Sequence, residues 1–371
     1  MIKCLLIEEV FILPGNHNVT RQHYARPECG ISTNRRGESM YIKDDSHATY
    51  KLLRTEFEKK GYTTIEQLVN DALYISFVSP EAKEWRFRAA RIGYPFTSAF
   101  VKELSVKKEK AYDYAKELGI SIPYTWYLQA DEVIDRTTVS ALIKKYNKLI
   151  VKPSNASLSR GLTLNIETEQ ELEDAIAYSR SFKDGVVVQE QVEGEEIRFI
   201  IVEGKVKAAL LRQTARVIGD GTLTIAELIK IENETRASLV FPYIKYPQLT
   251  ADIVAADFFT STEVLAKGEV KELNRATMIK NGSSIYNVLS EVHPSHIKVV
   301  EKLVDGLDTQ FLAADFFYKD YTQPMTESNY WFIEMNTSPV LKLCYGCRDG
   351  QMFDVIPYLV DVIDSWLHAK A

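Results

Sequence analysis

The sequence predicts an α+β protein, because helical stretches alternate with pairs of strands that lie close enough in the chain to form antiparallel hairpins. The first hairpin is expected at 195–212, EEIRFIIVEGKVKAALLR, where Glu203 and Gly204 separate two apolar runs. The second joins the strand FLAADFFYKD at 311–320 to the strand YWFIEMN at 330–336. Two such hairpins favour antiparallel sheets over a doubly wound parallel sheet.

Helix-end signals and apolar patterns place the other expected elements. The stretch at 106–118 is followed by Gly119, a residue typical of helix C-termini, and the stretch at 168–182 begins with a capping box formed by Thr168 and Glu171. Further helices are expected at 49–60 and 64–73, and further strands at 148–153 and 185–192.

Length, composition and charge indicate a globular protein. The chain has 371 residues, of which 46% are hydrophobic and 26% charged, enough for two or three structural units. The net charge of −6 and the lack of a basic tract argue against a nucleic-acid or anionic-membrane partner. Glu8 and Glu9 interrupt the apolar N-terminus, which is interpreted as a buried strand and not as a signal peptide. The polar segment 13–46 is predicted to be a long loop, and the protein to be soluble, cytoplasmic and compatible with a homodimer.

The stretch NYWFIEMNTSP at 329–339 places a carboxylate and an amide on an otherwise apolar strand. Strand alternation predicts that Glu334 and Asn336 share a face with Phe332, and that the opposite face carries Trp331, Ile333 and Met335. One interpretation is a surface strand whose polar face lies in water. The other is a cation site, because carboxylate and amide oxygens are ligands that Mg²⁺ prefers.

Asp315 lies in the strand that is expected to face this one. Asp315, Glu334 and Asn336 would therefore bring three oxygen-bearing groups to one patch. Such a patch fits Mg²⁺ that is held by a few protein oxygens and several nucleotide phosphate oxygens.

Two lysines are candidates for binding phosphate. Lys152 ends an apolar strand, and the small-residue loop after it, which includes Ser157 and Gly161, offers N–H and O–H donors to phosphate oxygens. The GxxxxGK[ST] pattern is absent, so an ordinary polar loop is the alternative. Lys108 by itself would be one charge on a solvated helix.

The stretch VVVQEQVEGEEIRF begins as an apolar strand and then turns polar, so its connector offers free backbone groups to a purine edge. Glu196 and Arg198 follow on one face of the next strand. Glu196 is a candidate acceptor for ribose hydroxyls, and Arg198 is a candidate for binding a substrate carboxylate. A cross-strand ion pair is the alternative interpretation of both residues.

Cys344 and Cys347 form the CxxC pair of CYGC. A zinc site would need two more ligands, for which Cys29 and His23 are distant candidates. Two reduced thiols in a loop are the preferred interpretation.

Taken in order, these motifs resemble the ATP-grasp superfamily from about Thr97 to the C-terminus, and in particular its glutathione-synthetase-like and cyanophycin-synthetase-like ligases. The segments VIGDGTLTIAELI at 217–229 and LNRATMIKNGSS at 273–284 are similar to segments of those ligases. The EMNTSP segment also resembles D-alanine–D-alanine ligases, although Ala313 stands where those have an arginine.

The resemblance implies an ATP-grasp fold, in which two α+β subdomains clasp ATP, with a smaller N-terminal α/β domain. The implied boundaries are 1–100 for the N-terminal domain, 101–185 for the small subdomain and 186–371 for the large one. The implied cofactors are ATP and Mg²⁺, as two ions that Mn²⁺ can replace. The metal ligands would be Asp315, Glu334 and Asn336, and the ATP-binding residues Lys108, Lys152, Ser157, Gly161, Glu190, Val192 and Glu196.

The activity that the resemblance implies is an ATP-dependent carboxylate–amine ligase, which forms an amide bond between amino-acid-like substrates through an acylphosphate. Arg212 is the first candidate for stabilising negative charge in that reaction. Arg275, Lys280 and Asn281 are weaker candidates, for which a surface role is equally compatible. The alternatives are a phosphotransferase that stops at a phosphorylated product and a nucleotide-binding regulatory module without turnover.

Overall fold

The computed structural model describes residues 48–70, 72–89, 92–129, 132, 134–146, 148–154, 161–182, 185–274 and 276–369. The expected N-terminal strand and the loop at 13–46 lie outside these ranges, as do Ser157, Arg275, Cys29 and His23. In the part of the chain that is described, no helix is both long enough and apolar enough to cross a bilayer.

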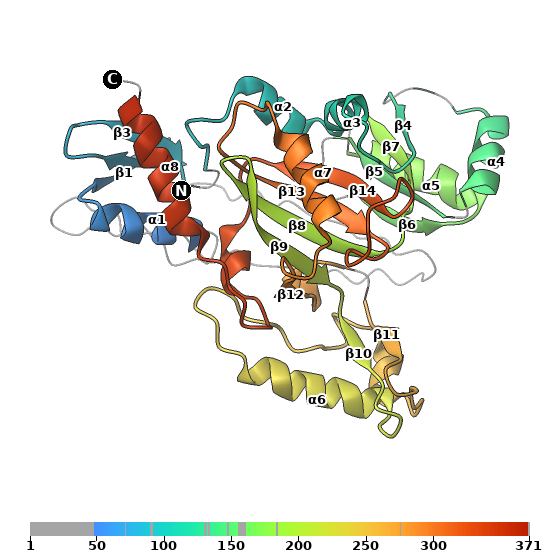
Figure 1. Ribbon diagram of the computed structural model, residues 1–371. Helices are drawn as coiled ribbons and strands as arrows, with labels where there is room; N and C mark the ends of the chain where they lie inside the picture. The colour runs from blue at the N-terminus through green and yellow to red at the C-terminus, as the bar shows by residue number, and fades with distance from the viewer. Residues whose placement is uncertain are drawn as a thin grey trace, which may run out of the picture. The chain divides into compact units, whose positions relative to one another are not determined.

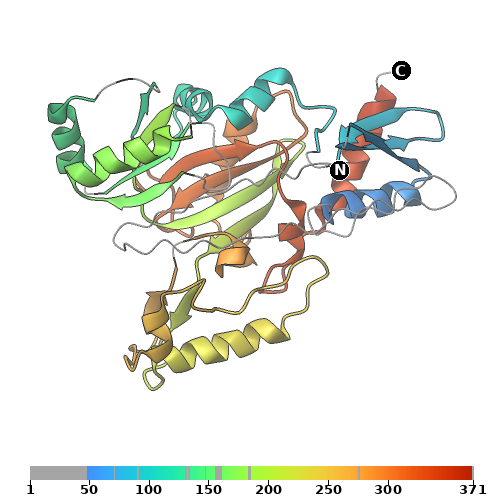
Figure 2. The same cartoon turned by 180° about the vertical axis from the view of Figure 1, so that it is seen from behind.

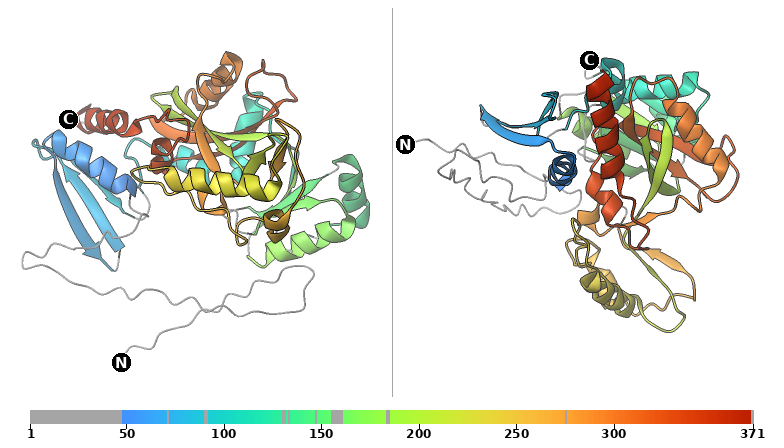
Figure 3. Two further views of the ribbon diagram at one scale, coloured as in Figure 1. Left: turned by 90° about the horizontal axis from the view of Figure 1, so that it is seen from below. Right: turned by 60° about the vertical axis from the view of Figure 1, so that its left-hand side comes forward.

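The first described elements are helix α1 (Ala48–Lys59) and a three-stranded antiparallel sheet of β1 (Thr63–Val69), β2 (Ala72–Val78) and β3 (Glu84–Arg88). The C-terminal helix α8 (Val355–Ala369) lies beside α1 (Figures 1 and 3). Asp364 of α8 accepts a hydrogen bond of 2.6 Å from the Tyr62 hydroxyl and one of 3.0 Å from Lys60. Stacked aromatic side chains such as Phe57 and Phe77 fill the space between α1 and the sheet.

The helix expected at 64–73 is a sequence prediction that the structure contradicts. Residues 63–69 form strand β1, and the chain turns at Asn70 to pair with β2. The segment TTIEQLV has β-branched residues at four of its positions, and its alternating exposure gives one face to solvent. Pairing with β2 therefore decides the conformation of this segment, against the weak helical pattern in its sequence.

The smaller of the two central sheets has the order β4-β7-β5-β6, with β4 at Thr125–Leu128, β7 at Val186–Glu190, β5 at Leu149–Pro153 and β6 at Thr163–Ile166. Helices α4 (Arg136–Lys145) and α5 (Glu169–Arg180) share its apolar core. Because β7 pairs with both β4 and β5, this sheet extends beyond the subdomain boundary that was expected after residue 185.

The larger sheet has five antiparallel strands in the order β12-β9-β8-β13-β14. Their bounds are Ser284–Asn287, Lys205–Gln213, Glu195–Val202, Phe311–Tyr318 and Tyr330–Asn336. Both predicted hairpins are confirmed: β8 pairs with β9, and β13 pairs with β14. Helices α2 (Ala99–Val106), α3 (Lys108–Glu117) and α7 (Pro294–Val304) share the apolar core on one face of this sheet. Figure 1 shows α7 in front of the strands, and Figure 2 shows the sheet from the opposite side.

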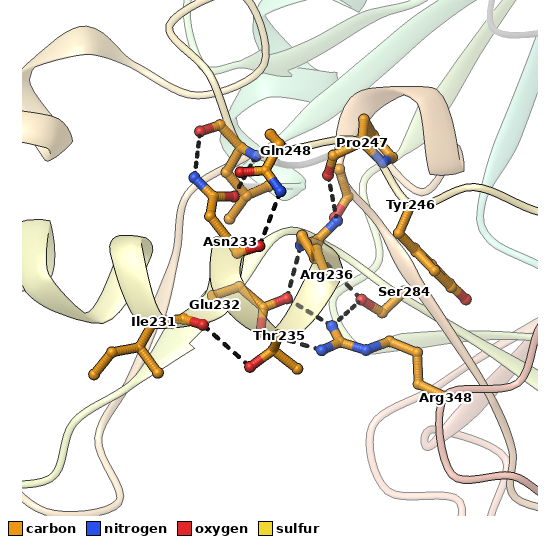
Figure 4. A network of polar contacts seen from close by, with 12 residues as sticks. Ile231, Glu232, Asn233, Thr235, Arg236, Tyr246, Pro247, Gln248, Ser284 and Arg348 are labelled. Atoms are coloured by element: carbon orange, nitrogen blue, oxygen red, sulfur yellow. Dashed lines mark hydrogen bonds and ion pairs between the residues drawn. The ribbon is translucent and has the colours of Figure 1, made fainter. Parts of the chain in front are cut away.

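A further segment, 214–283, has an apolar core of its own around helix α6 (Ile225–Ser238) and the strand pair β10 (Arg216–Ile218) and β11 (Val270–Glu272). Figure 4 shows how α6 is fastened to the larger sheet. Glu232 accepts hydrogen bonds from Arg236 at 2.7 Å and from Arg348 at 2.6 Å. Arg348 also donates to Ser284 of the edge strand β12 at 2.8 Å. One carboxylate thus joins two guanidinium groups from distant parts of the chain.

Candidate active site

A β-bulge decides which side chains of β14 reach the candidate site. Asp315 pairs with Glu334, but Phe316 pairs with Phe332, so Ile333 is the extra residue on β14. Phe332 consequently packs in the apolar core, and the prediction that it shares a face with Glu334 is wrong. The physical reason is that one inserted residue reverses the alternation of a strand, which a strict period of two cannot anticipate.

Arg198, Asp315 and Glu334 occupy matched positions on β8, β13 and β14. Arg198 donates from Nε to Asp315 Oδ1 at 2.7 Å and from Nη2 to Asp315 Oδ2 at 2.6 Å. Both residues are buried, with exposed fractions of 8% and 2%. The same Nη2 lies 3.8 Å from Glu334 Oε1. The structure therefore places Arg198 in the cross-strand ion pair that was the alternative to substrate binding.

Arg212 on β9 extends this arrangement to the next strand. Its Nη1 donates to Glu196 Oε1 and lies 3.7 Å from Asp315 Oδ2. The carboxylate expected to accept from ribose hydroxyls is thus already bonded to the guanidinium expected to stabilise negative charge. We refer to the resulting side chains of the larger sheet as the charged row: Arg212, Glu196, Arg198, Asp315 and Glu334.

The protonation states within the charged row follow from burial and neighbouring charge. Burial opposes ionisation of Asp315, but the charge of Arg198 outweighs it and lowers the pKa of that carboxyl. Partial burial raises the pKa of Glu334, whose side chain is 41% exposed, and the adjacent Asp315 raises it further. Arg198, Lys108 and Lys152 each oppose that increase. Glu334 is therefore the carboxylate whose negative charge is least compensated.

The two candidate phosphate lysines lie close enough to Glu334 to affect its ionisation. Lys108 is the first residue of α3, and Lys152 lies in β5. Burial lowers the pKa of Lys152 to about 8, and the charge of Glu334 partly opposes that decrease. The structure thus brings three predicted site residues from different elements into one electrostatic environment.

Gln189 is a polar residue of the candidate site that sequence reasoning did not single out. It lies in β7 with 2% of its surface exposed, and its Oε1 accepts a hydrogen bond of 2.9 Å from Lys152 Nζ. The signal in the sequence was an amide inside the apolar run VVVQE, where a buried polar group needs partners.

The expected adenine-binding positions lie where β7 ends. Glu190 accepts a hydrogen bond from the Tyr124 amide at 3.3 Å, and its own amide donates to the Tyr124 carbonyl at 2.9 Å. Val192 is half-buried in the connector that follows. The Glu190 side chain therefore supports the start of β4, and the backbone of the connector is what a purine could contact.

Gly161 has a structural reason to be glycine at the end of the small-residue loop. Its φ is +71°, and a Cβ atom would lie 2.7 Å from the Pro153 ring and 2.8 Å from Phe182. A side chain would therefore collide with both neighbours. Any contact with phosphate would be made by the Gly161 backbone.

The remaining predicted site residues lie outside the charged row. Asn336 is on β14, and its Oδ1 accepts a hydrogen bond of 2.8 Å from the Ser338 amide. Lys280 and Asn281 belong to the short 3-10 helix η3 (Ile279–Asn281) that leads into β12. Since β12 pairs with β9 at Arg212, η3 precedes the strand beside that arginine.

Cys344 and Cys347 are free and fully buried. Burial raises the pKa of Cys347 to about 12 and that of Cys344 well above its usual range, so both thiols stay protonated and unreactive at neutral pH. Within the described ranges, no three His, Cys, Asp or Glu side chains gather as a metal site would require. Asp315 and Glu334 are thus a two-carboxylate pair, and other oxygens would have to complete a metal shell.

Sequence comparisons find similarity to known proteins over part of this chain. Residues 114–268 match the family model described as the D-ala D-ala ligase C-terminus. The cyanophycin synthetase of Geminocystis herdmanii is 28% identical over 269 residues, which is 70% of this chain and 30% of that protein. The glutathione biosynthesis bifunctional protein GshAB of Streptococcus agalactiae is 25% identical over 57% of this chain and 30% of its own length. The chain thus spans about a third of the length of these relatives.

A solved structure shares the fold. The bifunctional glutathione synthetase from Pasteurella multocida superposes with a TM-score of 0.55 and 16% sequence identity, over 88% of this chain and 44% of that one. At this identity the likeness concerns the arrangement of the elements alone.

Replacing Arg198 with methionine should strongly destabilise the protein, because Asp315 would stay buried without its main partner. We expect the free energy of unfolding to fall by about 3–5 kcal/mol, measured by urea denaturation. The double variant Arg198→Met/Asp315→Leu should lose less, because it removes both charges.

Lys205→Met is the matched control, because Lys205 pairs with Glu301 at 2.9 Å but is 65% exposed. Its loss should cost less than about 1 kcal/mol. An Arg198→Met variant no less stable than this control would contradict the assigned role of the buried pair.

Proposed function

We propose that this chain belongs to the ATP-grasp superfamily and is an ATP-dependent ligase that joins a carboxylate to an amine and releases ADP and phosphate. The observation that carries the proposal is the charged row together with Lys108 and Lys152. The positive charges of both lysines act on Glu334, the last member of the row. Paired charges next to a partly exposed, less compensated carboxylate suit a polyanionic substrate whose charge moves during the reaction.

The proposed chemistry solves a leaving-group problem. A carboxylate does not react with an amine at neutral pH, because the oxygen that would have to leave is a poor leaving group. Phosphoryl transfer from ATP converts that oxygen into phosphate, and the amine then displaces it. The protein need not supply a nucleophile: it orients the substrates and places positive charge where negative charge develops.

Within this proposal, Lys108 and Lys152 contact the phosphates of ATP, together with the loop that contains Ser157 and Gly161. The adenine lies against the connector at Glu190 and Val192. These assignments are supported by the motifs and by the burial that lowers the pKa of Lys152. They are also supported by the positive charges of both lysines, which oppose the increase in the pKa of Glu334.

Glu196 is proposed to accept from the ribose hydroxyls. Because it is hydrogen-bonded to Arg212 in the structure, those hydroxyls would compete with the guanidinium for its oxygens. Nucleotide binding would then leave Arg212 with fewer protein partners and more capacity to contact the transferred phosphoryl group. Arg275, Lys280 and Asn281 remain candidates for contacting the substrates.

Asp315, Glu334 and Asn336 are the residues that we propose hold Mg²⁺, as two ions, with Mn²⁺ able to substitute. The donor set fits, because two carboxylates of adjacent strands lie together and the pKa of Glu334 is raised by burial and by Asp315. When bound, Mg²⁺ would neutralise phosphate charge. Arg198 would keep Asp315 ionised and oriented throughout.

The substrates that we propose are a small-molecule acid and a small-molecule amine, both similar to amino acids. The net charge of −6 gives no reason to expect a nucleic-acid partner. Cytoplasmic location and homodimer formation stay predictions from the sequence.

Hydroxylamine trapping tests the reaction class. Purified protein with Mg–ATP should release ADP in the presence of the right amino acids, offered singly and in pairs. One amide bond should form for each ADP, as mass spectrometry of the products will show. With hydroxylamine in place of the natural amine, a hydroxamate should accumulate. A stable phosphorylated alcohol without any hydroxamate would instead make the protein a phosphotransferase.

Arg212→Ala should lower kcat by about 10²–10³-fold while changing the affinity for ATP little, because a preorganised contact to developing negative charge is lost. Arg212→Lys should restore only part of the rate, since it keeps the charge but not the planar fork. Steady-state kinetics with saturating substrates measures both variants.

Arg216→Ala is the matched control. Arg216 and Arg212 are each 14% exposed and each pair with a glutamate of β8, but the partner of Arg216 is Glu195 and not Glu196. Equal losses of kcat in the two alanine variants, or a loss of ATP affinity alone in Arg212→Ala, would show that the role is misassigned.

The affinity for Mg–ATP should decrease as the pH rises from about 7 to about 9, because only the protonated form of Lys152 attracts phosphate and its pKa in the free protein is about 8. A lysine with an ordinary pKa would leave the affinity unchanged over that interval. Arg at this position stays charged, so Lys152→Arg should remove the decrease. The same profile in both proteins, measured by calorimetry, would argue against a direct contact between Lys152 and ATP.

A further inference from the structure

We propose that Gln189 is a positioning residue that orders both phosphate-binding lysines before ATP arrives. It would act on Lys152 directly and on Lys108 through Tyr112 of α3. The inference rests on the proposed ATP site, but it concerns side chains to which neither the motifs nor the comparisons give a role.

The hydrogen-bonding pattern of Gln189 allows one orientation of its amide. Lys152 Nζ can only donate, so the atom 2.9 Å from it must be the carbonyl oxygen Oε1. The Nε2 group then donates both of its hydrogens, to Thr125 Oγ1 at 2.8 Å and to Tyr112 Oη at 3.1 Å. Because Gln189 is 2% exposed, its amide has little access to bulk water. The amide is therefore held at three points and can itself hold the lysine.

The position of Gln189 lets it act on two elements at once. It lies in the central part of the smaller sheet, opposite Thr125 of β4 and Ile150 of β5. Tyr112 is one helical turn after Lys108 on α3, so the two side chains lie along the same side of that helix. The Tyr112 ring packs edge-on against Phe332 of β14, with ring centroids 6.0 Å apart. The bond between Gln189 and Tyr112 thus connects the smaller sheet to a helix of the larger sheet's core.

An amide suits this position better than the other side chains of similar size. A methionine would fill the space but would leave Lys152 without its acceptor, and the buried Tyr112 hydroxyl and the half-buried Thr125 hydroxyl without their donor. A glutamate would add a negative charge beside Lys152, and that charge would compete with phosphate for the ammonium group. Gln189 orients one N–H of Lys152 without neutralising it, and the other two remain available to ATP. Ordering a lysine side chain in advance removes part of the entropy cost of binding.

The test uses the full chain and Mg–ATP itself, whose affinity is measured by displacement of a fluorescent nucleotide. For Gln189→Met we expect about tenfold weaker binding, together with a raised KM for ATP. The value of kcat at saturating ATP should stay within about threefold, since uniform binding is what is lost. Tyr112→Phe removes only the hydroxyl and should weaken binding by about threefold.

Gln170→Met is the control, because Gln170 is an amide of helix α5 whose side chain donates to Asp174 of the same helix at 3.0 Å and belongs to no proposed binding element. It should leave ATP affinity within about twofold of the wild type. Thermal melts establish whether each variant is folded. If Gln189→Met does not fold, Tyr112→Phe provides the test in its place.

The outcomes separate this inference from the proposed function. Wild-type protein that does not bind Mg–ATP would overturn both. Wild-type protein that binds, with folded Gln189→Met or Tyr112→Phe binding equally well, would overturn the positioning role alone. A kcat loss larger than the change in KM would also overturn it, because Gln189 would then act in the transition state and not on the free lysines.

Discussion

The ion pair between Arg198 and Asp315 places two opposite charges inside the larger sheet, where neither would be stable alone. Because both oxygens of Asp315 accept from one guanidinium group, the carboxylate has a fixed orientation and stays ionised. Glu334 is then left beside a second negative charge, and its own ionisation depends on cations that come from other elements. The rest of the candidate site is therefore arranged around the buried negative charge of Asp315, which the pairing with Arg198 stabilises.

The two faces of the larger sheet have different environments, one apolar and one charged. The bulge at Ile333 places Phe332 on the apolar face and Glu334 on the charged face. On one face the helices α2, α3 and α7 cover an apolar core that includes Phe332 and Met335. On the other face the charged row crosses four neighbouring strands. Without the inserted residue, Phe332 and Glu334 would compete for the same side of β14, and one of them would be in the wrong environment.

Much of the fold follows from local patterns, since hairpins and capping boxes depend on residues close together in the chain. The β8–β9 turn at Gly204, the pairing of Asp315 with the EMN strand and the Thr168 cap are of this kind. The partners of Arg198 and Arg212 could not be predicted, because they depend on the order of strands far apart in sequence. The same holds for β1, whose strand conformation depends on its pairing with β2. Gln189 was missed because a single amide in an apolar strand does not indicate which groups will meet it.

The segment 214–283 has its own apolar core and two chain connections to the larger sheet, so it has the features of an exchangeable module. The shared contact at Glu232 limits that exchange. Arg348 belongs to a part of the chain outside the module, yet its guanidinium group is bonded to the module's helix. A chimera that imports this module from a relative must also supply a carboxylate at the position of Glu232, or replace Arg348 together with it. Evolution of the module is therefore coupled to a distant arginine, and the two positions should change together across related proteins.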